Sequence, residues 1–149
     1  MILKGVRILH PLEFTPASAT LFRLTASYAV DFLTDEGTWK LRNRPGWLTD
    51  LRSGSSLIDC IVPKMGGAVY TAGILLHDTA FSGKMSFDLA NEMLRQCLIL
   101  SGEIGEFRAG LAAKAVSAFG RSHYYGVDDA LPEPYTLNRL FEGLTLEAR

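Results

Sequence analysis

The sequence predicts an α+β fold, in which a small N-terminal antiparallel β meander packs against about three C-terminal α-helices. Two observations predict this class. Within residues 19–50, apolar and polar residues alternate over short runs, as they do in half-buried strands. From residue 68 onward, apolar residues recur with a period near 3.6, which is typical of amphipathic helices.

The strands are expected in the runs "LFRLT", "SYAVDFLT" and "TWKLR". Turn signals separate them: Gly37 in "TDEGT" suits a left-handed turn position, and Pro45 precedes Gly46 in "NRPGW". Short connections of this kind join antiparallel neighbours, so we expect a meander over residues 19–50.

Three helices are expected over residues 68–120, in "AVYTAGILLHDTAF", "SFDLANEMLRQCLILSG" and "IGEFRAGLAAKAVSAFG". The second has the clearest ends, because Ser86 is a good N-cap, Asp88 suits the first turn, and Gly102 stops the helix. The third is rich in alanine and is expected to end at Gly120.

Residues 121–149 are predicted to form a C-terminal arm that begins as a loop and ends in one or two amphipathic helical turns. Its apolar residues at helical spacing are Leu137, Leu140, Phe141 and Leu144. Two interpretations are open. The arm docks on its own domain, or it buries this stripe as an interface with another subunit.

The chain has 149 residues, which fits a single domain, 1–149, with one hydrophobic core. Its net charge is −1 without a cluster of basic residues, which argues against nucleic acid as a partner. Neither a signal-peptide pattern nor a transmembrane segment is expected, so synthesis in a cytoplasm is predicted. Cys60 and Cys97 lack metal-ligand spacing and are interpreted as small buried hydrophobes, with a disulfide as the alternative.

The stretch "GILLHDTAF", residues 73–81, raises the question of catalysis because it sets a His-Asp pair in an apolar run. On a helical wheel, His77 falls on the apolar arc and Asp78 turns away from it. Gly73, one turn earlier, is expected to leave open space beneath the imidazole. Asn91 lies on the apolar face of the next helix, so the two inward polar groups are candidates to satisfy one another.

Two interpretations of this pair follow. In the first, His77 and Asn91 form a structural hydrogen bond that fixes the packing of the helices. In the second, His77 is a general base oriented by Asn91, and Asp78 holds a cation or a water molecule.

An ordered set of motifs resembles the phage and prophage proteins of domain-of-unknown-function family 1353. The motifs are "GWLTDLRSGSS", "AGILLHDTAF", "SFDLANEMLRQCL" and "AAKAVSAFGRSHY", and the resemblance spans roughly residues 28–125. The matched polar and aromatic positions include Thr49, Asp50, Ser53 and Phe81, and Asn91 stands where the family carries Asp. The resemblance implies a phage or prophage origin, but the family has no established activity.

The His-Asp helix is also similar, more loosely, to the active site of phospholipases A2. That similarity implies His77 as the base, Asp78 as a calcium ligand and Asn91 in the position that orients the histidine. The pair Gly66–Gly67 would stand in for part of a calcium loop, although calcium takes six to eight oxygen ligands and this segment offers few.

Asp50 has two interpretations: it caps the turn after a strand, with Ser53 in a similar local role, or it is the missing carboxylate partner of His77. The favoured function is a phage accessory protein, virion- or tail-associated, that contacts other phage proteins or copies of itself in a repeated assembly. Such a protein is made in the bacterial host cytoplasm, is incorporated in the particle and needs no cofactor. The alternative is a small hydrolase, phospholipase-like or acting on the cell envelope, with His77 as general base and calcium as its cofactor.

Overall fold

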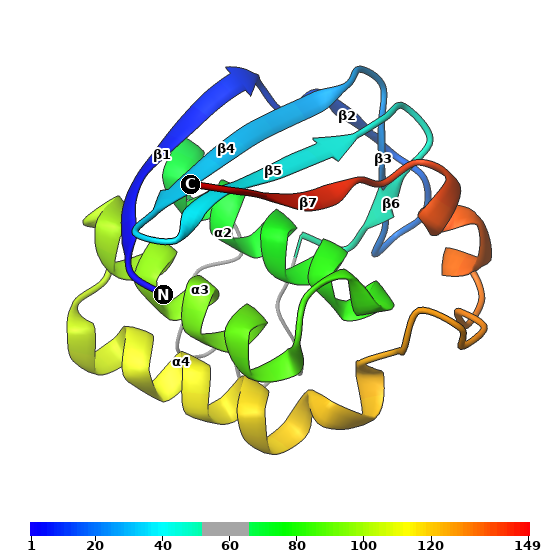
Figure 1. Cartoon of the computed structure of the whole chain (residues 1–149). Coiled ribbons are helices and arrows are strands. Elements are labelled where there is room, and N and C mark those ends of the chain that lie inside the picture. Colours follow the sequence, from blue (N-terminus) through cyan, green and yellow to red (C-terminus); the bar gives the residue numbers. More distant parts are fainter. Residues whose placement is uncertain (52–65) are drawn as a thin grey trace. The chain divides into compact units, whose positions relative to one another are not determined.

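The computed structural model describes residues 1–51 and 66–149 (Figure 1). They form two compact units. The sheet unit comprises Met1–Asp50 and Asp128–Arg149, and the helical unit comprises Leu51–Val127. The predicted α+β class is confirmed, because strands dominate the first unit and helices the second. The predicted C-terminal arm is divided between the two units at residue 127.

The sheet unit contains two antiparallel sheets. The larger has the order β1-β4-β5-β7, formed by Leu3–His10, Tyr28–Thr34, Gly37–Asn43 and Leu144–Ala148. The smaller has the order β2-β3-β6, formed by Phe14–Pro16, Phe22–Leu24 and Leu48–Thr49. The predicted strands correspond to β3, β4 and β5, whereas β1, β2, β6 and β7 were not predicted.

The larger sheet has one apolar and one charged face. Val30 lies opposite Leu41, and Phe32 lies opposite Trp39, so these buried side chains share the apolar face. On the other face, the buried Asp31 carboxylate accepts hydrogen bonds from Arg7 and Arg42, at 3.0 and 2.6 Å. The pattern of one apolar and one polar face is the usual one for an antiparallel sheet.

The hairpin between β4 and β5 forms where "TDEGT" predicted a turn. The Thr34 hydroxyl donates to the Gly37 carbonyl at 2.7 Å and accepts from the Gly37 N–H at 3.2 Å. Gly37 has φ +149°, and a Cβ there would lie 2.4 Å from the Glu147 carbonyl oxygen. Glycine is therefore required both by the turn and by the close approach of β7.

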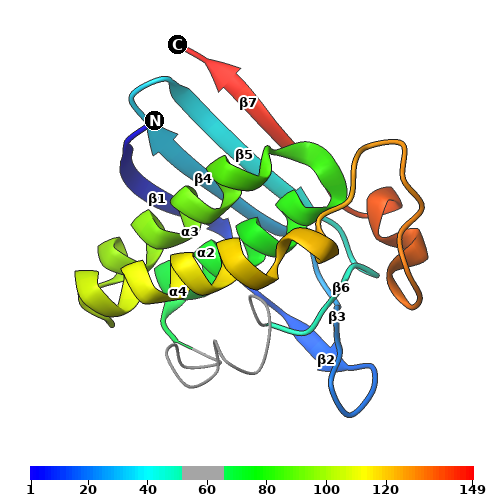
Figure 2. The ribbon, with the colours of Figure 1, turned by 90° about the horizontal axis from the view of Figure 1, so that it is seen from below.

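The C-terminal segment forms the predicted short helical turns at Leu137 and Leu140, but Leu144 lies in a strand that was not predicted. A 3₁₀ helix, η3, spans Tyr135–Leu140, and the chain then enters β7, which lies beside β5 in both views (Figures 1 and 2). The leucines spaced three to four residues apart are therefore divided between a short helix and a strand. The strand forms because its backbone hydrogen-bonds to β5, about a hundred residues earlier in the chain. The interpretation that the arm docks on its own domain holds for β7.

The helical unit contains α2 (Ala68–Thr79), a π-turn η1 (Ala80–Lys84), α3 (Phe87–Ser101), α4 (Glu106–Phe119) and a 3₁₀ turn η2 (Arg121–His123). Figure 2 shows α2, α3 and α4 side by side. The predicted ends of α3 are confirmed: the Ser86 hydroxyl accepts from the Leu89 N–H, and Gly102 adopts the left-handed conformation with φ +74°. α4 ends at Gly120 as predicted.

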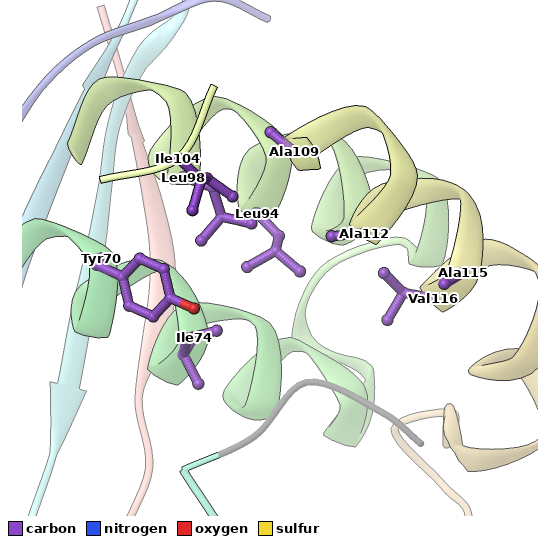
Figure 3. Close-up of a cluster of buried hydrophobic side chains, with 9 residues drawn as sticks. All are labelled: Tyr70, Ile74, Leu94, Leu98, Ile104, Ala109, Ala112, Ala115 and Val116. Carbon is purple, nitrogen blue, oxygen red and sulfur yellow. The ribbon is translucent and has the colours of Figure 1, made fainter. Parts of the chain in front are cut away.

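The core of the helical unit combines large residues from two helices with small residues from the third. α2 and α3 contribute bulky side chains, whereas α4 contributes mainly alanines (Figure 3). Because alanine leaves little volume to fill, α4 lies close to its neighbours. The cluster consists of Tyr70, Ile74, Leu94, Leu98, Ile104, Ala109, Ala112, Ala115 and Val116.

Gly73 marks a close approach of α2 and α3. A Cβ on Gly73 would lie 2.6 Å from the Cβ of Cys97, which is free and buried. The prediction of open space beneath His77 is therefore wrong, because α3 occupies that space. Cys97 is the small buried residue that the sequence suggested, and Cys60 lies outside the described residues.

Candidate functional site

The predicted site centres on His77 in the last turn of α2. Its side chain is almost fully buried, and its Nε2 donates to the Asn91 Oδ1 of α3 at 2.8 Å. The Asn91 Nδ2 in turn donates to the Ser117 Oγ of α4 at 3.2 Å. A chain of two hydrogen bonds therefore joins all three helices, and the predicted pairing of His77 with Asn91 is present.

The Phe81 ring packs against the imidazole and is itself part of an aromatic cluster. The Phe81 ring in η1 lies with its centroid 4.3 Å from that of His77, and it contacts the rings of Phe87 and Tyr124 at 6.0 and 5.8 Å. The Arg121 guanidinium lies over the Phe87 ring at 4.9 Å. The π-turn places Phe81 there, and the Tyr125 N–H donates to the Phe81 carbonyl at 2.8 Å.

Phe81 stands at a matched position in the sequence, but Ser117, Arg121 and Tyr124 were not predicted to lie near these residues. Ser117 sits on an alanine-rich helix, and Tyr124 and Arg121 follow it in a stretch interpreted as loop. The only signal was the motif "AAKAVSAFGRSHY", which marks the segment without assigning contacts.

Burial lowers the pKa of His77 to about 4, an effect that the hydrogen bond to Asn91 opposes only in part. The imidazole is therefore neutral at pH 7, with Nε2 protonated because Asn91 offers an oxygen. Protonation of Nδ1 as well would create a buried imidazolium, the charged form that burial disfavours. The group that hydrogen-bonds the imidazole Nε2 is the side-chain amide of Asn91.

Of the other candidate catalytic residues, Asp78 belongs to the helical unit and Asp50 to the sheet unit. Asp78 is half-buried at the end of α2, and Asn91, not Asp78, accepts from the imidazole. Asp50 directly follows β6 in the sheet unit, where the buried Thr49 is paired with Phe22 of β3. Ser53 lies outside the described residues.

At the glycine pair that was the candidate calcium loop, a backbone N–H is bound by a carboxylate of this chain. The Gly67 N–H, at the start of α2, donates to both carboxylate oxygens of Glu103 at 2.9 Å. A carboxylate at a helix N-terminus satisfies an unpaired donor and favours the helix dipole, so Glu103 acts as a cap for α2. In the part of the chain that the structure describes, no group of three or more His, Cys, Asp or Glu side chains is placed to hold a metal ion.

The residues of the predicted interface lie in different environments. Leu137 and Leu140, both in η3, are each 60% exposed. Phe141 is half-buried against the turn at Gly46, whose Cβ would lie 3.1 Å from the ring, and Leu144 is buried at the start of β7. Only the two leucines of η3 are available to a partner as large exposed side chains of this set.

Comparison with protein-family models, with curated proteins and with solved structures finds no match. None of the described helices is long and apolar enough to cross a membrane.

Proposed function

We propose that this chain is an accessory protein of a phage or prophage particle, virion- or tail-associated, and that it acts through protein–protein contacts in a repeated assembly. The proposed origin rests on the ordered motifs that resemble family 1353. The observation that carries the choice of an assembly role over catalysis is the state of His77, which is buried, neutral and bonded to an amide.

A hydrolase with His77 as general base would need a carboxylate or a similar group to stabilise the imidazolium during turnover. Asn91 supplies an amide oxygen, which cannot balance a full positive charge in a buried position. The aromatic ring of Phe81 packs against the His77 imidazole. These features argue for a structural His77 and leave contacts between proteins as the better-supported activity.

The candidate contact surface of the proposed assembly is the pair Leu137 and Leu140, because they are the exposed apolar residues of the C-terminal arm in η3. Asn138, which lies between them, is buried and anchors η3: its amide accepts from the Leu48 N–H at 3.0 Å and donates to the Leu48 carbonyl at 2.9 Å. A turn fixed in this way presents its two leucines without requiring them for its own folding.

The test is incorporation of the chain into particles. Particles released by the phage or induced prophage that encodes the chain are purified on a density gradient, and the chain is detected with an antibody. We expect the wild-type chain in the particle band and a loss of at least about tenfold for the Leu137→Ser/Leu140→Ser double variant. Leu100→Ser is the matched control, because Leu100 is 45% exposed in the helical unit, and it is expected to be incorporated normally.

A His77→Gln variant separates the two functions. The assembly proposal expects normal incorporation and normal infectivity wherever the variant protein remains folded. Normal incorporation with abolished infectivity or lysis would instead support the hydrolase. A wild-type chain that is absent from purified particles would refute the assembly proposal.

A further inference from the structure

The free edge of β7 is the backbone edge of Leu144–Ala148 that faces away from β5. Among residues 1–51 and 66–149, β5 is the only strand that pairs with β7, which is therefore an edge strand of the larger sheet. Thr145, Leu146, Glu147 and Ala148 are all exposed. An exposed edge of this kind is a template for pairing with another strand.

The register identifies which backbone groups lie on the free edge. The Arg42 N–H donates to the Gly143 carbonyl at 2.7 Å, and the Arg149 N–H donates to the Glu36 carbonyl at 3.3 Å. Hydrogen-bonded pairs alternate along an antiparallel ladder, so Thr145 and Glu147 direct their backbone groups toward β5. Leu144, Leu146 and Ala148 consequently direct their N–H and C=O groups to the free edge.

The two edges of the sheet differ. β1, at the opposite edge, carries register shifts between Leu3 and Gly5 and between Ile8 and His10, and such bulges interrupt the ladder that a further strand would need. β7 has a continuous register from Leu144 to Ala148, with neither lysine nor proline. The register shifts that protect β1 from further pairing are absent from β7.

We propose that the free edge of β7 pairs with β7 of a second copy of this chain, antiparallel about a two-fold axis at Leu146. This inference deepens the proposed function, on which it rests, by naming the partner of one surface. The register is self-complementary. Leu146 meets Leu146 of the second copy, and Leu144 meets Ala148, so each pair that bonds across the axis is apolar.

The side chains agree with this register on both faces. Leu146 lies opposite Trp39, and Leu144 lies opposite Leu41, so the new apolar contacts continue the apolar face of the sheet. On the other face, Thr145 meets Glu147 of the second copy, and no like charges lie directly opposite one another. Glu147 already forms an ion pair with Lys40. Moving the axis to Glu147 would set two carboxylates directly against each other, which is unfavourable.

The experiment measures the oligomeric state of the full chain and its dependence on one backbone donor. Ala148→Pro removes an N–H from the free edge and leaves the donors that face β5, a position at which edge strands accept proline. By sedimentation velocity, we expect the wild-type chain to form dimers and the variant to dissociate with a Kd raised about tenfold to a hundredfold. Circular dichroism at 222 and 215 nm verifies that the variant remains folded.

Cysteine cross-linking tests the position of the axis independently of proline. Paired residues at the axis lie about 5.5 Å apart between Cα atoms, within disulfide range, so Leu146→Cys should form a disulfide-linked dimer on mild oxidation. Leu9→Cys is the matched control, because Leu9 on β1 is 44% exposed and Leu146 is 41% exposed. We expect Leu146→Cys to cross-link at least about tenfold faster than Leu9→Cys.

A monomeric wild-type chain at 100 μM would overturn the inference, and so would a dimer that Ala148→Pro leaves intact or equal cross-linking of the two cysteine variants. These outcomes are distinct from failure of the proposed function. A chain that enters particles as a monomer refutes the β7 pairing alone, and a chain that dimerises but is absent from particles refutes the proposed function alone.

Discussion

Acid should destabilise this protein through His77, and the size of the effect follows from its burial. The pKa of His77 is about 4 in the folded chain, against an ordinary value of 6.5. Between these two values the unfolded chain binds a proton that the folded chain does not, so stability falls as the pH decreases from 6.5 toward 4. One pKa unit corresponds to about 1.36 kcal/mol, which gives a total loss of about 3 kcal/mol and about 2 kcal/mol at pH 5.

The assay compares wild type with His77→Gln by urea unfolding at a series of pH values, followed by circular dichroism at 222 nm. Glutamine keeps a donor for Asn91 but does not titrate, so the variant should lack this component of the acid loss, whatever its stability at pH 7.5. The groups other than His77 are common to both proteins, so their contributions cancel in the difference. The prediction would be refuted if the free energies of unfolding of wild type and His77→Gln fell in parallel as the pH decreased. An NMR titration of His77 with a midpoint above pH 6 would also refute it.

Three further predictions concern the fold. Gly73→Ala should destabilise the protein by about 1–3 kcal/mol, because the new Cβ meets Cys97. Gly110→Ala, which has open space around the new Cβ, should be neutral or stabilising by up to about 1 kcal/mol. Thermal unfolding of both variants measures the difference. Ser86→Ala should cost about 1 kcal/mol by loss of the helix cap, and an unchanged urea midpoint would contradict that. Asp31→Asn should lower stability at pH 7 and reduce its loss in acid, because two arginines lower the pKa of this carboxyl despite its burial; unfolding at pH 7 and pH 3 measures both effects.

Local signals in the sequence were sufficient for the elements whose ends are fixed by neighbouring residues. α3 begins where the Ser86 hydroxyl accepts from the Leu89 N–H and ends where Gly102 becomes left-handed, and both residues are recognisable by type. β4 and β5 were predictable because Gly37 marks a turn between two alternating runs. The information for each of these elements lies within a few residues of it.

The strands at both edges of the sheet depend on distant partners, and local patterns failed there. β7 has five residues, too few for a period of two to be distinguished from one of 3.6, and its hydrogen bonds come from β5. β1 is paired with β4 in the same non-local way. The sequence of an edge strand therefore contains little local information about its structure, because the strand forms only by pairing with a distant neighbour.

The site was predictable in part for the same reason. Helical wheels placed His77 and Asn91 on inward faces, and a buried polar group requires a partner, so their contact followed from two local patterns. The way α2 and α3 cross at Gly73 and Cys97 determines which residues of α4 they contact. A helical wheel describes one helix at a time and cannot predict this crossing. Ser117 was therefore missed, although it completes the hydrogen-bonded chain.

An amide at position 91 suits a neutral imidazole better than a carboxylate would. Asn91 offers one oxygen to the Nε2–H of His77 and one N–H to Ser117, so both of its polar atoms are bonded without any charge in the core. A carboxylate there would favour a buried imidazolium, and such an ion pair carries a desolvation cost that its Coulomb attraction offsets only with good geometry. Directional bonds from α2 to α3 and from α3 to α4 fix the register of three helices whose alanine-rich contacts discriminate poorly between alternative packings. In the His-Asp motif, the hydrogen bond to Asn91 therefore makes His77 a neutral link between α2 and α3.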